Sequence, residues 1–180
     1  MGGTKVVDTI AQTFGIFGML LAILSFQCKK NTRFFLLQAL SGLLFSVNFF
    51  MIGAIGGALC NAANVARGAL FSKSDRVKWK LVVNLVMYFA CMVVSLIFVW
   101  GDAKQMILTM LTISASVAST AAMWTGSGAF IRKIQLYCSS PLWLIHNCFN
   151  FSLGGILCES FNMLSVIVSF IRYGKDGFEK

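Results

Sequence analysis

The chain is organised around a stretch that occurs twice, first as Gly56-Gly57-Ala58-Leu59-Cys60-Asn61-Ala62-Ala63-Asn64. It returns 98 residues later as Gly154-Gly155-Ile156-Leu157-Cys158-Glu159-Ser160-Phe161-Asn162, with both Gly, the Leu, the Cys and the last Asn in the same places. A constant offset of this kind is typical of a structural repeat. Each copy follows one long apolar run and begins another. We therefore interpret each glycine pair as a tight turn between two membrane helices.

The composition is that of an integral membrane protein. Of the 180 residues, 58% are hydrophobic and 12% are charged, whereas soluble domains have about 45–50% apolar and about 25% charged residues. No soluble fold of this length could bury so much apolar surface, so lipid must cover most of it. The first apolar run ends in Lys29-Lys30 and not in a small-residue cleavage site, which excludes a signal peptide.

Apolar runs divide the chain into seven predicted membrane helices, since a bilayer core needs about 20 apolar residues per helix. We expect them near Val6–Gln27, Phe34–Ile52, Ala58–Phe71, Leu81–Trp100, Gln105–Trp124, Arg132–Phe151 and Ile156–Tyr173. A second three-helix unit in the orientation of the first requires one extra crossing, which the fourth helix supplies. The sequence therefore predicts an all-α membrane protein with a 3+1+3 parallel repeat. Its parts are a first bundle over 1–72, a linker helix with its loops over 73–104, a second bundle over 105–173 and a cytoplasmic tail over 174–180.

Basic residues collect on one side of this predicted arrangement. If the N-terminus is outside, 13 of the 15 Lys and Arg fall on the inner side and only Lys5 and Lys104 on the outer side. Because Lys and Arg concentrate in cytoplasmic loops, we expect the N-terminus outside and the C-terminus in the cytoplasm. The net charge of +9 then reflects topology and contact with anionic lipid headgroups. No nucleic-acid motif accompanies these residues, so we expect no nucleic-acid partner.

The sequence contains no motif typical of a metal site or of an enzyme. None of the six Cys forms a CxxC pair, and with a single His we expect no metal site and no cofactor. The Cys most simply act as small buried hydrophobes; a disulfide between the equivalent Cys60 and Cys158 is the alternative. HExxH, GxSxG, GxGxxG and P-loop patterns do not occur. We therefore do not expect an enzyme.

Two known families resemble this chain. Ser25-Phe26-Gln27, followed by Lys and Arg, resembles the PQ-loop position of SWEET-like proteins, as does the 3+1+3 count. The whole run from Gln38 through Asn48-Phe49-Phe50-Met51-Ile52-Gly53-Ala54 to Arg67, with Trp143–Asn147 and Gly154–Leu157, resembles the YgjV group of bacterial inner-membrane proteins. That resemblance covers nearly the whole chain and implies the inner membrane as location, with no established substrate.

One residue departs from the SWEET-like pattern. Phe26 stands where the PQ dipeptide has its Pro, so the first bundle lacks the kink that a Pro gives to a helix. The only Pro of the chain is Pro141, in the predicted sixth helix. A rocking mechanism taken from SWEET proteins is therefore least secure for the first bundle.

The repeated Asn64 and Asn162 are the first candidates for a solute site. Each lies roughly 10 Å into a core that is about 30 Å thick. In the SWEET-like pattern the paired Asn of the third and seventh helices face the substrate, which implies that role here. The alternative is that they join helices by hydrogen bonds. Asn61 and Arg67 share a face with Asn64, and the same face of the last helix carries Glu159, Asn162, Ser165 and Ser169.

Glu159 and His146 form a second candidate pair. They lie on either side of the last predicted turn, and their repeat counterparts are Asn61 and Asn48. Ionisable groups within a membrane often mark functional sites, and a His–Glu pair could relay protons. The alternative is that Glu159 only stabilises the N-terminal end of its helix, because a negative charge interacts favourably with the helix dipole there. Trp143 could stack on a sugar or base, or act as packing.

These residues lead to one preferred function and two alternatives. We expect a transporter of a small polar, mostly neutral solute that works by alternating access between two three-helix bundles. The candidate solute-binding residues are Asn48, Asn61, Asn64, Trp143, His146 and Asn162, with Glu159 and His146 as proton-coupling residues. The alternatives are a non-transporting receptor of the same fold and an intramembrane enzyme. The sequence does not identify the substrate or the coupling ion, and it does not decide whether the protein forms a homo-oligomer.

Overall fold

The computed structural model describes residues 2–25, 31–71, 77–125 and 127–173, and these residues form helices and short turns without a strand. The helices are α1 (Gly2–Ser25), α2 (Asn31–Met51), α3 (Ile55–Leu70), α4 (Lys78–Phe98), α5 (Ala103–Thr125), α6 (Gly128–Ile134), the π-helical turn η1 (Gln135–Ser139), α7 (Ser140–Phe149) and α8 (Leu153–Tyr173). Because α6, η1 and α7 run end to end, the described residues form the seven predicted helical rods. The PQ-like position at Phe26-Gln27 and the tail over 174–180 lie outside the described residues.

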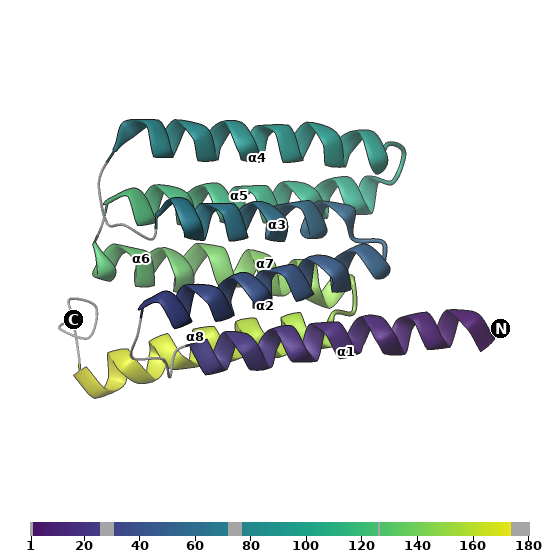
Figure 1. Cartoon of the computed structure of the whole chain (residues 1–180), viewed down its shortest axis with the longest axis horizontal. Coiled ribbons are helices and arrows are strands. Elements are labelled where there is room, and N and C mark those ends of the chain that lie inside the picture. The colour runs from purple at the N-terminus through teal and green to yellow at the C-terminus, as the bar shows by residue number, and fades with distance from the viewer. Residues whose placement is uncertain (1, 26–30, 72–76, 126, 174–180) are drawn as a thin grey trace.

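The helices pack in two layers with α4 along one edge (Figure 1). The first layer holds α1, α2 and α3 in chain order, and the second holds α5, the α6–α7 rod and α8. The layers meet where α1 packs on α8 and where α3 packs on α5. Helix α4 contacts α3 and α5 at the edge opposite α1 and α8. In the middle, the rings of Phe49 and Trp143 stack across the two layers at 5.9 Å between centroids.

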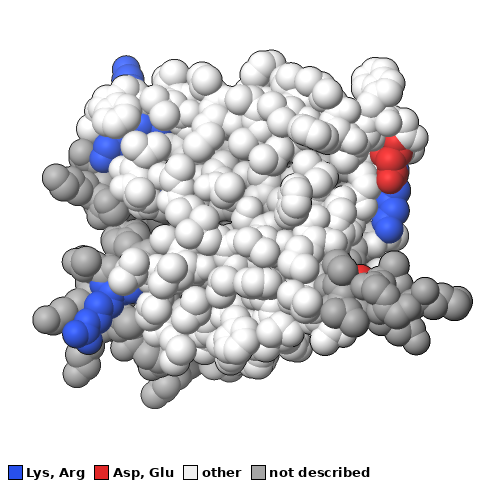
Figure 2. Space-filling view, turned by 45° about the vertical axis from the view of Figure 1, so that its right-hand side comes forward, with Lys and Arg blue, Asp and Glu red and all other residues white. Residues whose placement is uncertain are grey.

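The surface and α4 both indicate a lipid environment. On the face shown in Figure 2, the charged side chains lie at the two ends of the molecule, with a wide uncharged band between them. The buried side chains of α4 are Lys80, Asn84, Tyr88 and Ser95, whereas large apolar side chains such as Phe89 are exposed. A helix with its polar residues inside and its apolar residues outside is suited to a solvent of lipid and not of water.

Length and composition single out three of the rods as candidate membrane spans. They are Asp8–Ser25, Lys78–Phe98 and Ala103–Thr125. Two shorter apolar stretches, Leu36–Met51 and Leu153–Val168, belong to α2 and α8. A multi-pass membrane protein is therefore plausible from the apolar helices of the described residues.

The interpretation of the glycine pairs as turns is wrong. The chain turns at Ile52–Ala54 and again at Asn150–Ser152, and the glycine pairs lie in the first turns of α3 and α8 that follow. The positive φ that each corner requires belongs to Gly53 (φ +77°) and to Phe151 (φ +54°). A glycine can also be needed for close approach of a neighbouring group instead of for its backbone angle, and the site described below shows this second need.

The two corners nevertheless share one backbone design. Residues 48–58 and 146–156 make the same hydrogen bonds at the 98-residue offset of the sequence repeat. The matched bonds are Ile52 N to Asn48 O (3.1 Å) with Asn150 N to His146 O (3.1 Å), Gly53 N to Phe50 O (3.2 Å) with Phe151 N to Cys148 O (3.3 Å), Ala54 N to Phe49 O (2.8 Å) with Ser152 N to Asn147 O (3.0 Å), and Ala58 N to Ala54 O (3.0 Å) with Ile156 N to Ser152 O (2.9 Å).

The sixth predicted helix is interrupted. Instead of one α-helix over Arg132–Phe151, the rod widens into η1 immediately before Ser140-Pro141. The amide of Ser140 bonds the carbonyl of Gln135, five residues earlier. Pro141 has no amide hydrogen to donate to the preceding turn, so a Pro here is compatible with a local change of helix type. Single π-turns of this kind often occur at functional sites.

Candidate functional site

Polar side chains are buried between the two layers. Ser41, Asn48, Thr109, Thr112, Ser116, Ser139, Ser140, His146, Asn147 and Ser152 all belong to the buried residues. Membrane helices can bury polar groups in this way when the groups bond to each other or to backbone carbonyls. Buried and half-buried polar residues together form two clusters: the corner cluster (Gln12, Asn48, His146, Asn147 and Ser152) and the carboxylate cluster (Gln135, Ser140, Glu159 and Asn162).

Asn48 joins the two layers within the corner cluster. It is completely buried. Its Nδ2 donates to the carbonyl of Ala11 on α1 at 2.7 Å, and its Oδ1 accepts from the hydroxyl of Ser152 at 2.7 Å. Ser152 is itself fully buried, at the corner before α8. The amide therefore uses a donor toward its own layer and its acceptor toward the other layer.

His146 lies in an aromatic environment at the same corner. Its ring meets Phe49 edge-on at 5.0 Å and Trp143 at 5.4 Å between centroids, and it is 1% exposed. Its Nδ1 lies 3.3 Å from Oδ1 of Asn147. A Cβ added to Gly57 would stand 2.8 Å from the His146 Nε2. The imidazole thus packs directly on the backbone of α3, which only a glycine at this position permits.

The other glycines of the repeat serve the same purpose of close contact. A Cβ at Gly155 would lie 2.7 Å from the side-chain amide of Asn147. One at Gly56 would collide with the side chain of Thr109 on α5, and one at Gly154 would collide with the backbone of Gly15 on α1. Gly56, Gly57 and Gly154 therefore bring the corners against the opposite layer, and Gly155 brings α8 against α7, as small residues do in other membrane helix interfaces.

Side chains from α1 and α5 hold the α7–α8 corner in place. Gln12 donates to the carbonyl of Phe151 at 2.7 Å and accepts from the amide of Leu153 at 2.9 Å. Two further bonds from α5 reach the same corner: Lys104 Nζ to Phe149 O at 2.8 Å, and Gln105 Nε2 to Asn150 Oδ1 at 2.7 Å. Together with Asn48, these side chains hold the second layer's corner against the first layer and α5.

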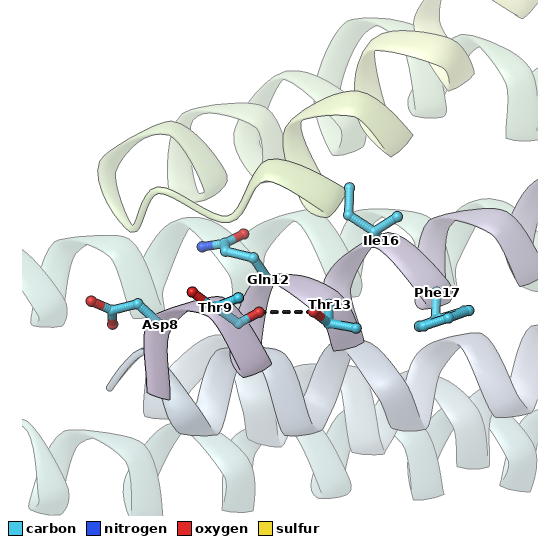
Figure 3. A pocket seen from close by; sticks show the side chains of 6 residues that line it. All are labelled: Asp8, Thr9, Gln12, Thr13, Ile16 and Phe17. Carbon is cyan, nitrogen blue, oxygen red and sulfur yellow. Dashed lines mark hydrogen bonds between the residues drawn. The ribbon is translucent and has the colours of Figure 1, made fainter. Parts of the chain in front are cut away.

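A groove of about 440 Å³ runs along α1 next to this corner. It is lined by Asp8, Thr9, Gln12, Thr13, Ile16 and Phe17. Figure 3 shows Gln12 directed from α1 toward the neighbouring corner, and the hydroxyl of Thr13 bonded to the carbonyl of Thr9 at 2.9 Å. The groove gives access to one edge of the corner cluster at Gln12.

The carboxylate cluster lies further along the same rods. The hydroxyl of Ser140 donates to Oε2 of Glu159 at 2.5 Å, and Nε2 of Gln135 donates to that hydroxyl at 2.7 Å. Nδ2 of Asn162 lies 3.4 Å from the same carboxylate oxygen. These contacts connect α8 to both ends of η1, where the π-turn brings Gln135 and Ser140 together.

The predicted solute residues are only partly brought together. Trp143 and His146 pack on Phe49, the residue that follows Asn48, and Asn48 bonds Ser152 at the same corner. Asn61 bonds the carbonyl of Gly57 one turn earlier in its own helix at 3.2 Å. Asn64 accepts a hydrogen bond from the hydroxyl of Tyr88 on α4 at 2.6 Å.

The repeated Asn64 and Asn162, predicted to share one solute site, are not brought together. Helix α3 packs on α2, α4 and α5, whereas α8 packs on α1, α7 and η1. The two Asn are equivalent along the chain but lie on helices at different edges of the layers, because α2 and the α6–α7 rod occupy the middle. Asn162 instead joins Glu159.

The predicted pair of His146 and Glu159 does not form either. Glu159 bonds Ser140, and His146 packs against Phe49 and Trp143. Residues 140 and 146 are six positions apart, which is about 240° around a helix of 3.6 residues per turn. Ser140 therefore faces α8 while His146 faces the first layer.

Cys60 and Cys158 are both free, so the alternative of a disulfide between them is wrong. The Cys60 Sγ lies 3.1 Å from the Ser116 hydroxyl on α5. Sequence reasoning missed Gln12, Ser140 and Ser152. No repeat signal marks them, because their counterparts at the 98-residue offset are Met110, Gly42 and Ala54.

The comparison with known proteins agrees with the membrane character of the fold. Residues 9–176 match the family Imp-YgjV, described as bacterial inner membrane protein. The chain belongs to this family. It is 24% identical over 165 residues to inner membrane protein YgjV of Escherichia coli (strain K12), which covers 91% of this chain and 84% of that protein. No solved structure matches the chain. The resemblance to the YgjV group is thus confirmed, together with an inner-membrane family.

Proposed function

We propose that this protein moves a small polar, mostly neutral solute across the bacterial inner membrane by alternating access between two halves. One half is α1–α3, the other is α5–α8, and α4 links them in a 3+1+3 arrangement similar to SWEET-like proteins. The observation that carries the proposal is the corner cluster, in which both halves contribute buried, mostly uncharged polar side chains to one place. Polar groups inside a membrane protein commonly mark a substrate path.

The chemistry of the cluster fits a neutral solute. An amide such as Asn48 offers donors and an acceptor without a charge that must lose its water. Ser152, Asn147 and Gln12 add a hydroxyl and two further amides. A solute that reached the cluster would replace the hydrogen bond between Ser152 and Asn48, which joins the halves. Breaking that bond on one side of the membrane while a solute binds is the type of exchange that alternating access requires.

A receptor that binds without transport is the second candidate. It is favoured by the hydrogen bonds of Asn48, because its amide nitrogen already bonds Ala11 and its amide oxygen already bonds Ser152. In such a protein, the cluster would hold the halves together permanently. The two functions differ in whether a solute crosses the bilayer.

Solute movement can be tested directly with the purified protein in lipid vesicles. The vesicles are mixed rapidly with glycerol, xylitol or urea, and reswelling is followed by light scattering. We expect faster reswelling than in protein-free vesicles for at least one of the three solutes. The variant Gly68→Ala is the control, because a Cβ at this position meets open space. Reswelling equal to that of protein-free vesicles for all three solutes would contradict the transport proposal.

The proposed orientation has the N-terminus outside and the C-terminus in the cytoplasm. It is supported by the uneven distribution of Lys and Arg along the chain. Of the basic residues assigned to the inner side, Lys29, Lys30, Lys73, Arg76, Lys175 and Lys180 lie outside the described residues. Fluorescence of green fluorescent protein fused after Lys180, together with no activity of alkaline phosphatase at the same position, is the expected result. The reverse pattern would place the C-terminus outside and overturn the proposed orientation.

A further inference from the structure

Glu159 is an acidic residue in the interior of the helical bundle. The other acidic residues with described side chains are Asp8, near the start of α1, and Asp102, immediately before α5. Glu159 is the seventh residue of α8, roughly 10 Å along the helix axis from its start. It faces Ser140 at the junction of η1 and α7. A carboxyl group at this depth is costly in a membrane unless its charge is compensated.

The described side chains around Glu159 supply hydrogen-bond donors but no positive charge. Its bonds come from Ser140 and Asn162. Among the residues with described side chains, the titratable and charged groups on the packed elements are Cys158 on α8, Tyr137 and Cys138 on η1, His146 and Cys148 on α7, and Asp8 on α1. The imidazole of His146 is directed to Phe49 and Trp143. Among the Lys and Arg with described side chains, none forms an ion pair with Glu159.

The two carboxyl oxygens of Glu159 have different roles. Oε2 receives the hydrogen bonds of Ser140 and Asn162, which orient the group. Oε1 receives no hydrogen bond from the described side chains. A group held by neutral donors on one oxygen, in a region of lipid, reaches electrical neutrality most simply by taking a proton on the other oxygen.

We propose that Glu159 is a proton-binding site, that the proton is the coupling ion of solute movement, and that His146 has no part in it. A hydronium ion gives its proton to Oε1 and leaves as water; the reverse step returns the carboxylate, and no other bond forms or breaks. The coupling part of this proposal rests on the proposed transport function. The proton site itself does not, because it can be observed in the protein without a solute.

The place of the site explains how a proton would affect the fold. Ser140 joins Glu159 to the rod just where the π-turn and Pro141 interrupt the α-helix. Helices bend at such interruptions. A charged carboxylate is a stronger hydrogen-bond acceptor than a neutral acid, so proton binding loosens the bond between α8 and Ser140. The α6–α7 rod can then bend at η1 and carry the corner cluster with it.

The proton site is tested by infrared difference spectroscopy of the purified protein in vesicles, between about pH 5 and about pH 9, the range that buried carboxyl groups span. We expect a carboxylic acid C=O band that appears on acidification. It should be absent in Glu159→Gln, and it should remain in Ser140→Ala and in Asp102→Asn. Asp102 is the matched control because it accepts from the amide of Gln105 at an exposed helix start.

Two outcomes would overturn the proton site. The first is a carboxylic acid band that persists in Glu159→Gln. The second is the absence of this band in the wild-type protein, together with a thermal stability that depends on Na⁺ at fixed pH. Coupling is read separately, from the pH inside the vesicles with a trapped dye during solute uptake. In vesicles with the wild-type protein, the internal pH should change during solute uptake. In vesicles with Glu159→Gln, this pH change should be lost. A band without reswelling would refute transport alone, whereas reswelling without the band would refute the proton site alone.

Discussion

The two corners of this protein have the same backbone and different side-chain support. The α2–α3 corner and the α7–α8 corner repeat four backbone hydrogen bonds at the same offset. In the described part of the chain, side chains of α1 and α5 bond only one of the two corners, the α7–α8 corner, through Gln12, Lys104 and Gln105. Ser152 of that corner donates to Asn48, the first residue of the α2–α3 corner. The repeat therefore determines how the chain turns, while unrepeated side chains determine which corner is fixed to its neighbours.

The largest effect is expected from filling the glycine contacts. A Cβ at Gly154 meets the backbone of Gly15, which cannot rotate away, whereas one at Gly56 meets a side chain, that of Thr109. We expect Gly154→Ala to destabilise the protein by about 1–3 kcal/mol, the range for overpacking, and Gly56→Ala by less. Thermal unfolding in detergent measures both. Gly68→Ala is the control and should be neutral or slightly stabilising; equal losses at Gly154 and Gly68 would contradict the close packing.

Removal of the amide that joins the layers should come next. Asn48→Ala leaves the buried hydroxyl of Ser152 and the carbonyl of Ala11 without their partner, which costs about 1–2 kcal/mol. We expect it to abolish solute-driven reswelling as well. Asn64→Ala removes the bond with Tyr88 at the α4 edge and should cost about 0.6 kcal/mol with reswelling retained. Loss of reswelling in Asn64→Ala alone would move the solute site to α3 and α4.

A third pair of variants exchanges the residues with positive φ. Phe151 is 76% exposed and holds φ at +54°, so its side chain contributes little packing to offset the strain. Phe151→Gly should stabilise the protein by about 1 kcal/mol, and Gly53→Ala should destabilise it by a similar amount. Chemical or thermal unfolding compares them. Destabilisation by Phe151→Gly would show that the exposed ring makes a stabilising contact at this corner.

The smallest effect tests the side-chain support itself. Gln12 accepts from the amide of Leu153, and the equivalent amide at the other corner belongs to Ile55. Gln12→Ala should lower global stability by only about 0.5–1 kcal/mol. It should nevertheless speed hydrogen exchange at Leu153 and leave exchange at Ile55 unchanged, as measured by mass spectrometry of peptides from each corner. Equal acceleration at both corners would show that they open together.

The sequence predicts the helices of this protein well and their contacts poorly. Apolar runs of sufficient length indicate each of the seven rods, because burial in lipid requires continuous apolar segments. The prediction of the glycine pairs as turns is wrong because a sequence does not distinguish a Gly needed for its φ, such as Gly53, from one needed for space, such as Gly57. The same ambiguity shifted the predicted start of the third helix from Ile55 to Ala58.

The candidate site was predicted in part for a related reason. Asn48, Trp143 and His146 gather at the corner because each lies close to a turn that the repeat locates. Asn64 and Asn162 were paired by symmetry along the chain, and a sequence does not give the lateral order of helices in a layer. The bond between Ser140 and Glu159 depends on the π-turn, which no apolar pattern indicates.

The inverted polarity of α4 has a consequence for biosynthesis. When α4 leaves the ribosome, α3 is already made, so Tyr88 can reach Asn64 as soon as α4 enters the bilayer. Nδ2 of Asn84 and the hydroxyl of Ser95 donate to carbonyls of their own helix at 2.8 Å and 2.6 Å, so these donors need no later helix. α4 is also the most apolar of the three long candidate spans. Helix α4 can thus insert and dock on α3 before α5 is synthesised, and α5 through α8 can then assemble on α1–α4.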